Sequence, residues 1–302
     1  MSGDTAPGLD PKEESLTTRS PVVDAHHHFW APSRHDYYWM SGAELDPIRR
    51  SFAPADLRPL LAAAGVDYTV LVQTVPSVQE TREFMDIAAA TRFVAGIVGW
   101  VDLTDPAVGD TLAELQSQPN GKTLVGIRHQ VHDEKDAEWL LRPDVQRGLA
   151  AVRDAGLAYD ILVRPRELPA ALATANAFPG MRFVIDHIAK PPIASGKIDA
   201  WSALMEPFRP LTHVSCKLSG MITEAGWADW TPSDLKPYIT RAVDIFGADR
   251  VMYGSDWPVC LLAGSYGAVK SALEEALPPL SPDEWAKVFG GNAIRFYGLD
   301  VA

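Results

Sequence analysis

The chain has 302 residues, of which 47% are hydrophobic and 22% are charged, and its formal net charge is −12. This composition excludes a disordered or fibrous protein and fits one large globular domain or two small ones. The acidic charge is spread along the chain, which argues against binding to nucleic acid or to an anionic membrane. We therefore expect neither nucleic acid nor a membrane as a partner.

The first 20 residues, the apolar runs and the cysteines bear on where the protein is located. Residues 1–20 are polar, lack an apolar signal-peptide core, and predict a flexible tail before a single domain at 21–302. The longest apolar run, 94–101, is far shorter than the roughly 20 residues of a membrane span. Cys216 and Cys260 form no CxxC pair. These features favour a cytoplasmic protein.

Short apolar runs recur along the chain and alternate with longer stretches of helical spacing. The runs are nearly continuous in Val, Ile and Leu, as in parallel strands that are covered on both faces. Strict alternation leaves a doubly wound sheet or a barrel, and eight units in about 280 residues favour the (β/α)8 TIM barrel of the α/β class. The predicted strands lie at 22–30, 69–76, 94–103, 124–131, 157–164, 182–190, 213–221 and 251–258.

Four of the intervening stretches carry clear helix signals, such as Asp56 near one start and Gly65 or Gly247 at the ends. The long stretch between Ala31 and Asp67 predicts an elaborated loop over the barrel mouth. The predicted helices lie at 54–65, 78–91, 143–156 and 231–247.

Histidine and aspartate residues end three of the predicted strands. The first run ends in "VVDAHHHFW", where alternation places His26 and His28 on one face and His27 on the other. "FVIDHIAKP" places His187 after the sixth strand, and "VMYGSDWP" places Asp256 after the eighth. A His-rich turn, core histidines and a capping aspartate are the alternatives for each motif alone.

In a barrel, all strand carboxyl ends meet at one mouth, so these distant residues are expected to meet there. Three imidazoles and one carboxylate suit a borderline divalent ion such as zinc. We therefore expect His26, His28, His187 and Asp256 to be metal ligands and catalytic residues.

The sequence resembles the amidohydrolase superfamily, and within it the branch of sugar lactonases of the L-fuconolactonase and L-rhamnonolactonase type. The stretches that carry the resemblance run in order from Val22 to Leu299: "DAHHHFW", "VLVQTVPS", "VAGIVGWVDL", "GIRHQVHDE", "VIDHIAKPPI", "CKLSGMITEAG" and "GSDWPV". The resemblance implies a (β/α)8 barrel that hydrolyses a cyclic ester. It also implies that the HxH pair, His187 and Asp256 are the functional residues of the site.

The chain departs from the binuclear members of that superfamily. Those members need a bridging carboxylated Lys or a Glu near the end of the fourth strand and a His on the fifth. Here the fourth run ends in Arg128, His129 and Gln130, and the fifth reads "YDILVR". We therefore expect one divalent metal ion, zinc by preference, or a metal-independent enzyme that uses the histidines as hydrogen-bond donors.

Lactone opening needs an activated water, a stabilised oxyanion and a proton for the departing alkoxide. The resemblance gives the proton transfers to Asp256, while the three histidines hold the ion or donate to the oxyanion. Polar and aromatic residues near the strand ends are the expected substrate-binding residues, although each could equally be a salt-bridged or packing residue of the barrel, as could Lys217. They are Trp30, Gln73, Arg128, His129, Lys190 and Trp257.

Three functions follow from this pattern. The leading hypothesis is a hydrolase that opens a sugar-derived lactone, with the small lactone as its partner and a monomer or homodimer as its state. The first alternative is a zinc-dependent decarboxylase of an aromatic or unsaturated acid, which uses a similar set of ligands. The second alternative is a barrel that binds a sugar acid without turning it over.

Overall fold

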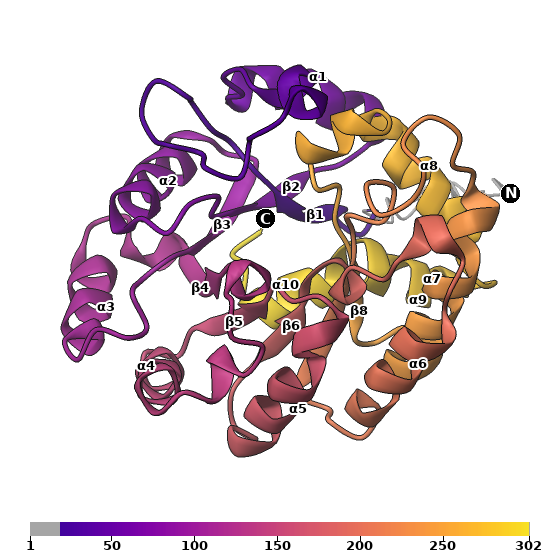
Figure 1. Ribbon diagram of the computed structural model, residues 1–302. Coiled ribbons are helices and arrows are strands. Elements are labelled where there is room, and N and C mark those ends of the chain that lie inside the picture. The colour runs from indigo at the N-terminus through magenta and orange to yellow at the C-terminus, as the bar shows by residue number, and fades with distance from the viewer. Residues whose placement is uncertain (1–18, 302) are drawn as a thin grey trace, which may run out of the picture.

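The computed structural model describes residues 19–301, and its centre is one sheet of eight parallel strands in the order β1 to β8. The ring closes between β8 and β1, because the N–H of Asp256 donates to the carbonyl of His26 at 2.8 Å and that of His28 donates to the carbonyl of Trp257 at 2.7 Å. This is the predicted (β/α)8 barrel (Figure 1). The strands are β1 Val23–His27, β2 Tyr68–Val72, β3 Val94–Gly99, β4 Leu124–His129, β5 Ala158–Ile161, β6 Phe183–Ile185, β7 Val214–Leu218 and β8 Val251–Tyr253.

Helices surround the barrel, and the four that the sequence predicts are α1, α2, α4 and α7. The carboxylate of Asp56 accepts from the N–H of Ala53 at the start of α1, and Gly65 ends that helix with a positive φ of 65°. The helices are α1 Pro54–Ala64, α2 Val78–Ala90, α3 Val108–Ser117, α4 Pro143–Asp154, α5 Leu168–Ala177, α6 Asp199–Met205, α7 Pro232–Phe246, α8 Tyr266–Ala276, α9 Pro282–Ala286 and α10 Asn292–Tyr297.

Two apolar clusters hold the barrel together. The larger one fills the space between the strands and the surrounding helices. The smaller one joins strand residues such as Val23 and Ala158 to Phe296 and Tyr297 of α10. Figure 1 shows α10 near the centre of the ring. The helix therefore closes the amino-terminal end of the barrel and leaves the carboxyl end open.

All eight strands end two to five residues earlier than the predicted runs, and β6 and β8 show the largest differences. β6 ends at Ile185, and residues 187–190 turn with four successive positive φ angles of 53°, 46°, 60° and 47°. β8 ends at Tyr253, and Asp256 has a φ of 56°. The prediction of strand over 186–190 and 254–258 is wrong, because the chain must turn at the mouth to aim its side chains into it.

Two further segments lie outside the barrel: the residues before β1 and the long loop at the mouth. The predicted tail, 1–20, lies outside the described residues except for Arg19 and Ser20, and Arg19 donates to the carboxylate of Asp67 at 2.8 Å. The stretch 31–67 runs as a loop with a short helical turn, Ala43–Ile48, before α1. Within residues 19–301, no helix has the length and hydrophobicity to cross a bilayer.

Candidate active site

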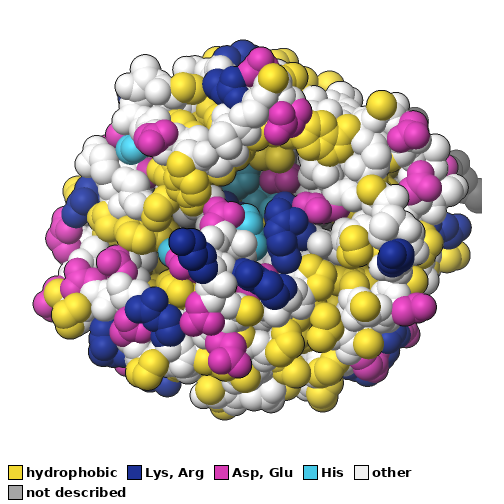
Figure 2. Space-filling model, in the orientation of Figure 1, with side chains coloured by type: hydrophobic (Ala, Val, Ile, Leu, Met, Phe, Trp, Pro, Cys, Tyr) yellow, Lys and Arg dark blue, Asp and Glu magenta, His cyan; other side chains and the backbone are white. Residues whose placement is uncertain are grey.

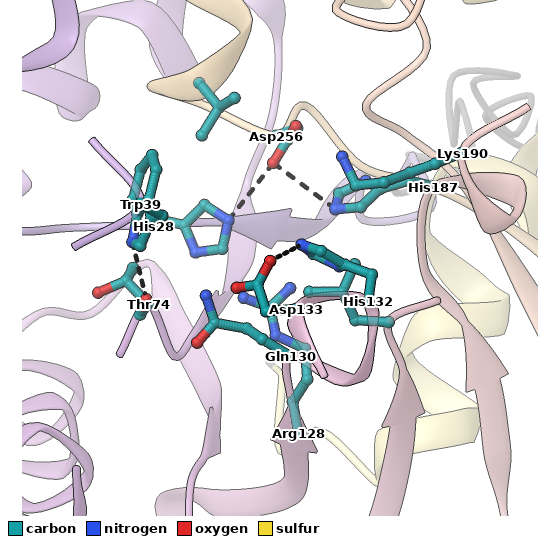
Figure 3. Close-up of a pocket in the computed structure, with 12 residues that line it drawn as sticks. His28, Trp39, Thr74, Arg128, Gln130, His132, Asp133, His187, Lys190 and Asp256 are labelled. Carbon is teal, nitrogen blue, oxygen red and sulfur yellow. Dashed lines mark hydrogen bonds and ion pairs between the residues drawn. The ribbon is translucent and has the colours of Figure 1, made fainter. Parts of the chain in front are cut away.

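The carboxyl ends of the strands surround a small pocket, and histidine side chains lie in the hollow on the face that Figure 2 shows. This is the end at which barrel enzymes carry their active sites. The cavity volume is about 130 Å³, well under the roughly 300–1,000 Å³ of sites for drug-sized ligands. It therefore suits one small ring. The lining residues are His28, Trp39, Thr74, Arg128, Gln130, His132, Asp133, Leu162, His187, Lys190, Asp256 and Val259 (Figure 3).

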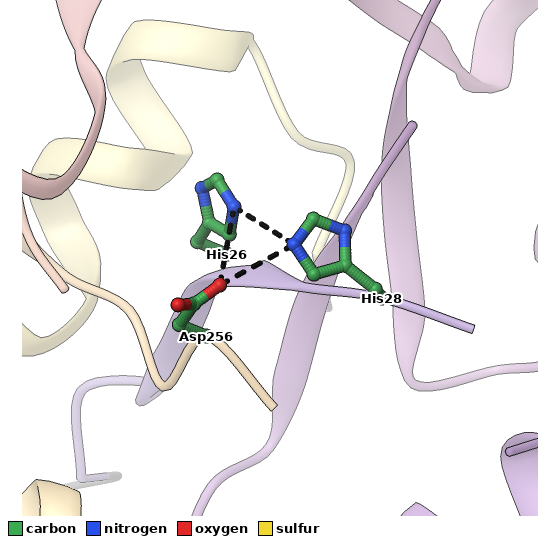
Figure 4. A group of neighbouring side chains, drawn as sticks. All are labelled: His26, His28 and Asp256. Atoms are coloured by element: carbon green, nitrogen blue, oxygen red, sulfur yellow. Dashed lines mark hydrogen bonds and ion pairs between the residues drawn. The ribbon is translucent and has the colours of Figure 1, made fainter. Parts of the chain in front are cut away.

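Three imidazoles converge on one carboxylate oxygen, Oδ1 of Asp256. This oxygen lies 3.3 Å from Nε2 of His28 and 3.8 Å from Nε2 of both His26 and His187. The Nε2 atoms of His26 and His28 are 3.2 Å apart (Figure 4). His27 points away from this cluster, and its Nε2 lies 2.8 Å from Oγ1 of Thr69. The structure thus brings together the four residues that the sequence assigns to one site.

The far nitrogens of two imidazoles have partners that set the ring orientations. Nδ1 of His28 lies 2.7 Å from the carbonyl oxygen of Val72. Because a carbonyl can only accept, Nδ1 carries the proton and Nε2 presents its lone pair to the cluster. Nδ1 of His187 lies 2.9 Å from Oγ of Ser219. Partners of this kind fix the orientation of histidine ligands in metal sites.

A left-handed turn places His187. Each non-glycine residue in this conformation costs roughly 1–2 kcal/mol, so neighbours must hold the turn. The indole of Trp201 in α6 donates to the carbonyl of Ile188 at 2.8 Å. Gly220 leaves room for the ring, since a Cβ there would stand 2.5 Å from Nδ1 of His187. The turn directs His187 to the cluster and Lys190 to the pocket wall.

A buried carboxylate that the sequence analysis missed, Asp24, ties the end of β8 to β1. Asp24 accepts from both the N–H and the hydroxyl of Ser255, at 2.8 and 2.6 Å, and from the hydroxyl of Tyr266 at 3.1 Å. It also accepts from the N–H of His26 at 3.1 Å. Burial raises the pKa of Asp24 to about 6. This carboxylate therefore fixes Asp256, the next residue after Ser255, relative to the HxH pair.

A second set of buried charges lies inside the barrel beneath the histidines. Nζ of Lys217 lies 2.6 Å from Oδ2 of Asp160, 3.0 Å from Oδ1 of Asp186 and 3.1 Å from Nδ1 of His26. Arg128 donates to Oδ2 of Asp186 at 3.1 Å. The four charged side chains are at most 4% exposed and their formal charges cancel. The only sequence signal for this network is a charged residue within each apolar run.

The carboxylates of this network differ in their environment. Burial raises the pKa of Asp160 to about 6. Burial also acts to raise the pKa of Asp186, but the positive charges of Lys217 and Arg128 outweigh it and hold that pKa below its usual value. Asp186 is therefore ionised at neutral pH and pairs with both cations.

The residues of the cluster fit one divalent metal ion. Burial lowers the pKa of His26 and of His28, so both are neutral at neutral pH, and His28 offers the lone pair of its Nε2 to the cluster. Their separations from each other and from Asp256, 3.2–3.8 Å, are close to the roughly 3.3–3.6 Å edge of a tetrahedron with zinc–ligand distances of roughly 2.0–2.2 Å.

A second group of candidate ligands shares His26 with the first. His26, Asp186 and His187 also offer donor atoms that lie within 4.8 Å of one another. Lys217 and Arg128 already contact the two oxygens of Asp186, however. The described residues therefore fit one ion better than two.

The sequence matches a known protein family over most of its length. A model of the amidohydrolase family matches residues 23–299. The chain belongs to the amidohydrolase family. Two curated relatives of this amidohydrolase are named L-fucono-1,5-lactonase. The one from Burkholderia ambifaria is 45% identical over 92% of this chain and 96% of its own length, and the one from Burkholderia multivorans is 37% identical over the same shares.

A solved structure has the same fold as this amidohydrolase. It is an amidohydrolase from Burkholderia multivorans with bound zinc, 34% identical, with a TM-score of 0.87. The match covers 93% of this chain and 100% of that chain. The similarity extends over the whole barrel and includes every strand that contributes to the cluster.

The amidohydrolase places the predicted substrate-binding residues in two groups. Arg128 and Lys190 line the pocket. The other four, Gln73, His129, Trp30 and Trp257, are absent from the described pocket lining.

These four residues support the wall from behind. Gln73 is fully buried and its Oε1 accepts from Nε of Arg128 at 3.0 Å, while the ring of His129 stacks on Trp139. Trp30 and Trp257 are 3% and 1% exposed and pack against Phe52. Their geometry is that of packing residues, and their effect on substrate stays a prediction.

Sequence reasoning missed most of the polar pocket wall. Trp39 reaches the pocket from the long mouth loop, and its indole donates to the carbonyl of Thr74 at 3.0 Å. Gln130, His132 and Asp133 follow β4 in "RHQVHDE". This polar run after an apolar strand is the signal that could have found them.

Proposed function

We propose that this amidohydrolase opens the cyclic ester of a sugar-derived lactone, such as a fuconolactone or rhamnonolactone, to give the free acid. The observation that carries the proposal is the convergence of three imidazoles on Oδ1 of Asp256 at the base of a pocket sized for one small ring. The two curated relatives named L-fucono-1,5-lactonase support a lactone over the substrate of a decarboxylase. A barrel that only binds a sugar acid would not need a carboxylate at the centre of three imidazoles.

Asp256 performs the proton transfers in this proposal. Its carboxylate takes a proton from the attacking water and returns it to the ring oxygen as the ester bond breaks. His28 and His187 flank Oδ1 of Asp256 on the pocket wall. With the lone pair of its Nε2 facing the cluster, His28 would hold the divalent ion that offsets charge on the carbonyl oxygen. The catalytic set is His26, His28, His187 and Asp256.

We propose that the same four residues hold one zinc ion. The neutral imidazoles, the carboxylate and their separations support this assignment, as does the zinc in the related Burkholderia multivorans structure. Bound there, the ion would supply Lewis acidity toward the lactone carbonyl. A metal-independent enzyme, with the histidines as direct hydrogen-bond donors, is the alternative that metal removal tests.

Substrate binding falls to Arg128 and Lys190 at the pocket wall, with Gln130, His132 and Asp133 beside them. Gln73 holds Arg128, and Trp30, His129 and Trp257 shape the wall by packing. A cytoplasmic location fits the two buried cysteines, which are free.

A pH-indicator hydrolysis screen over five- and six-membered aldonolactones tests the function. The purified protein is assayed before and after chelation, with its metal content measured on the same batch. The proposal expects acid release from at least one sugar lactone, loss of turnover on chelation, and recovery with zinc. Turnover that survives complete metal removal would assign the histidines as oxyanion donors. Metal-loaded protein that opens no lactone of the panel would overturn the proposed function.

A further inference from the structure

The two cations at the pocket wall are both already paired. Nζ of Lys190 donates to Oε1 of Glu224 at 2.9 Å, and these side chains are only 15% and 17% exposed. Arg128 uses Nη1 on Asp186 and its other nitrogens on the side chain and carbonyl of Gln73. A carboxylate on a ligand is normally recognised by a cation with free donors, above all a bidentate arginine. Lys190 keeps further N–H donors, but the carboxylate of Glu224 offsets its charge. Asp186 and Gln73 hold Arg128.

The same wall also carries negative charge. Asp133 lines the pocket, where its Oδ1 lies 3.2 Å from Nε2 of His132 and its Oδ2 accepts from the hydroxyl of Tyr38 at 3.1 Å. Burial acts to raise the pKa of Asp133, but the bond from His132 outweighs it and the pKa lies below its usual value. Asp133 is therefore ionised at neutral pH and adds negative charge to the exposed rim of the pocket.

One further cation stands near this group without joining the described pocket lining. Arg164 is exposed, and its charge acts on both His132 and Asp133. The positive charge of Arg164 therefore partly offsets the negative charge of Asp133. The polar groups of the lining that remain for a ligand include the amide of Gln130, the imidazole of His132 and the ammonium of Lys190, which can bind hydroxyl groups through hydrogen bonds.

We propose that the Lys190–Glu224 ion pair is a specificity element that makes the pocket accept uncharged, hydroxyl-bearing lactones and reject lactones that carry a carboxylate. This inference rests on the proposed function and adds the charge of its substrate. The carboxylate of Glu224 neutralises the charge of Lys190, so that the ammonium donates to hydroxyl groups but does not attract an anion. Removing the charge of Glu224 should convert Lys190 into an anion-binding group.

The test uses a matched pair of substrates: an aldonolactone, and the aldarolactone of the same ring configuration, in which a carboxylate replaces the terminal hydroxymethyl group. Wild type is expected to prefer the neutral lactone in kcat/KM. The ratio of kcat/KM for the charged lactone to kcat/KM for the neutral lactone should rise about tenfold in Glu224→Gln. The change should come mainly through KM, because a charge-assisted hydrogen bond becomes available. The double variant Glu224→Gln/Lys190→Met should return the ratio to that of wild type.

The matched control is Glu274→Gln, which removes the carboxylate partner of Lys270 on α8, where Oε1 lies 2.7 Å from Nζ. It should leave the ratio unchanged. A wild-type enzyme that takes both lactones equally, or a Glu224→Gln variant with an unchanged ratio, would overturn the inference.

Calorimetric binding of the open-chain aldarate dianion separates this inference from the proposed function. Glu224→Gln should bind the aldarate about tenfold more tightly than wild type, whether or not either protein hydrolyses a lactone. Equal binding by the two proteins would contradict the inference. Tighter binding by the variant, together with no turnover of any lactone by wild type, would uphold the charge selectivity and reject the lactonase.

Discussion

Lys217 of β7 and Asp160 of β5 form an ion pair of 2.6 Å inside the barrel, where neither side chain is exposed. Asp186 completes the set at 3.0 Å from the same ammonium. Breaking a buried pair by removing one partner leaves an uncompensated charge, which is far more costly than losing a surface pair. The stability of the fold therefore depends on this buried charge network, which lies beneath the histidines of the site.

We expect Lys217→Met to lower the free energy of unfolding by about 3–5 kcal/mol, because Asp160 and Asp186 lose their shared cation. Urea denaturation measures this change. Lys287→Met, which removes an exposed ion pair with Asp249, is the control and should cost below about 1 kcal/mol. Lys217→Met/Asp160→Asn should be more stable than Lys217→Met alone. Equal urea midpoints for wild type and Lys217→Met would contradict the account.

Asp24 is expected to act through Asp256. Asp24→Asn loses one of two carboxylate oxygens that accept from Ser255, so the turn that carries Asp256 shifts relative to β1. We expect kcat on the best lactone to fall by roughly 10–100-fold with little change in KM, since the general base is misplaced while the pocket wall is kept. Asp56→Asn at the start of α1 is the control and should retain kcat. A rise in KM at constant kcat would show that Asp24 supports substrate binding instead.

Ser219 should tune metal affinity through His187. Ser219→Ala removes the partner 2.9 Å from Nδ1 of His187, which frees the ring to rotate. Loss of such a partner typically weakens metal binding about 10–100-fold. Competition with a chelator of known affinity measures the change, and exposed Ser195→Ala is the control. Zinc affinity equal to wild type would contradict a positioning role for Ser219.

The pH dependence of stability should contain a contribution from Glu80, whose pKa burial raises to about 7. The folded protein holds the proton of Glu80 more tightly than the unfolded chain, so this contribution is present below the unfolded pKa of about 4.5 and is lost as pH rises through about 7. The free energy of unfolding of wild type should therefore fall between pH 5 and 7 relative to Glu80→Gln. The difference should change by at most about 1.4 kcal/mol per pH unit. Parallel pH profiles for the two proteins would contradict it.

The barrel could be predicted because its strands are buried on both faces and therefore read as continuous apolar runs. The helices that follow carry local signals, such as Asp56 before α1 and the Gly65 that ends it, and these depend only on neighbours in sequence. The HxH pair, His187 and Asp256 could be assigned to one site because parallel strands bring their carboxyl ends to one mouth. Their chemistry and their meeting place both follow from the chain pattern.

The supporting parts of the site could not be predicted in this way. The left-handed turn that begins at His187 is stabilised by Trp201 and by the space at Gly220, which are distant in sequence. Lys217 and Asp160 are 57 residues apart, and nothing in either apolar run says which buried charge meets which. Such pairings are decided by tertiary packing, which a single sequence does not display.

Asp256→Asn shows whether this carboxylate moves the protons of lactone opening. Asparagine keeps the shape of the side chain but cannot accept a proton from water. With the best lactone from the screen, turnover should fall by about 100-fold or more, while calorimetry still detects lactone binding within a few-fold of wild type. Turnover close to that of wild type, with lactone still bound, would contradict the claim.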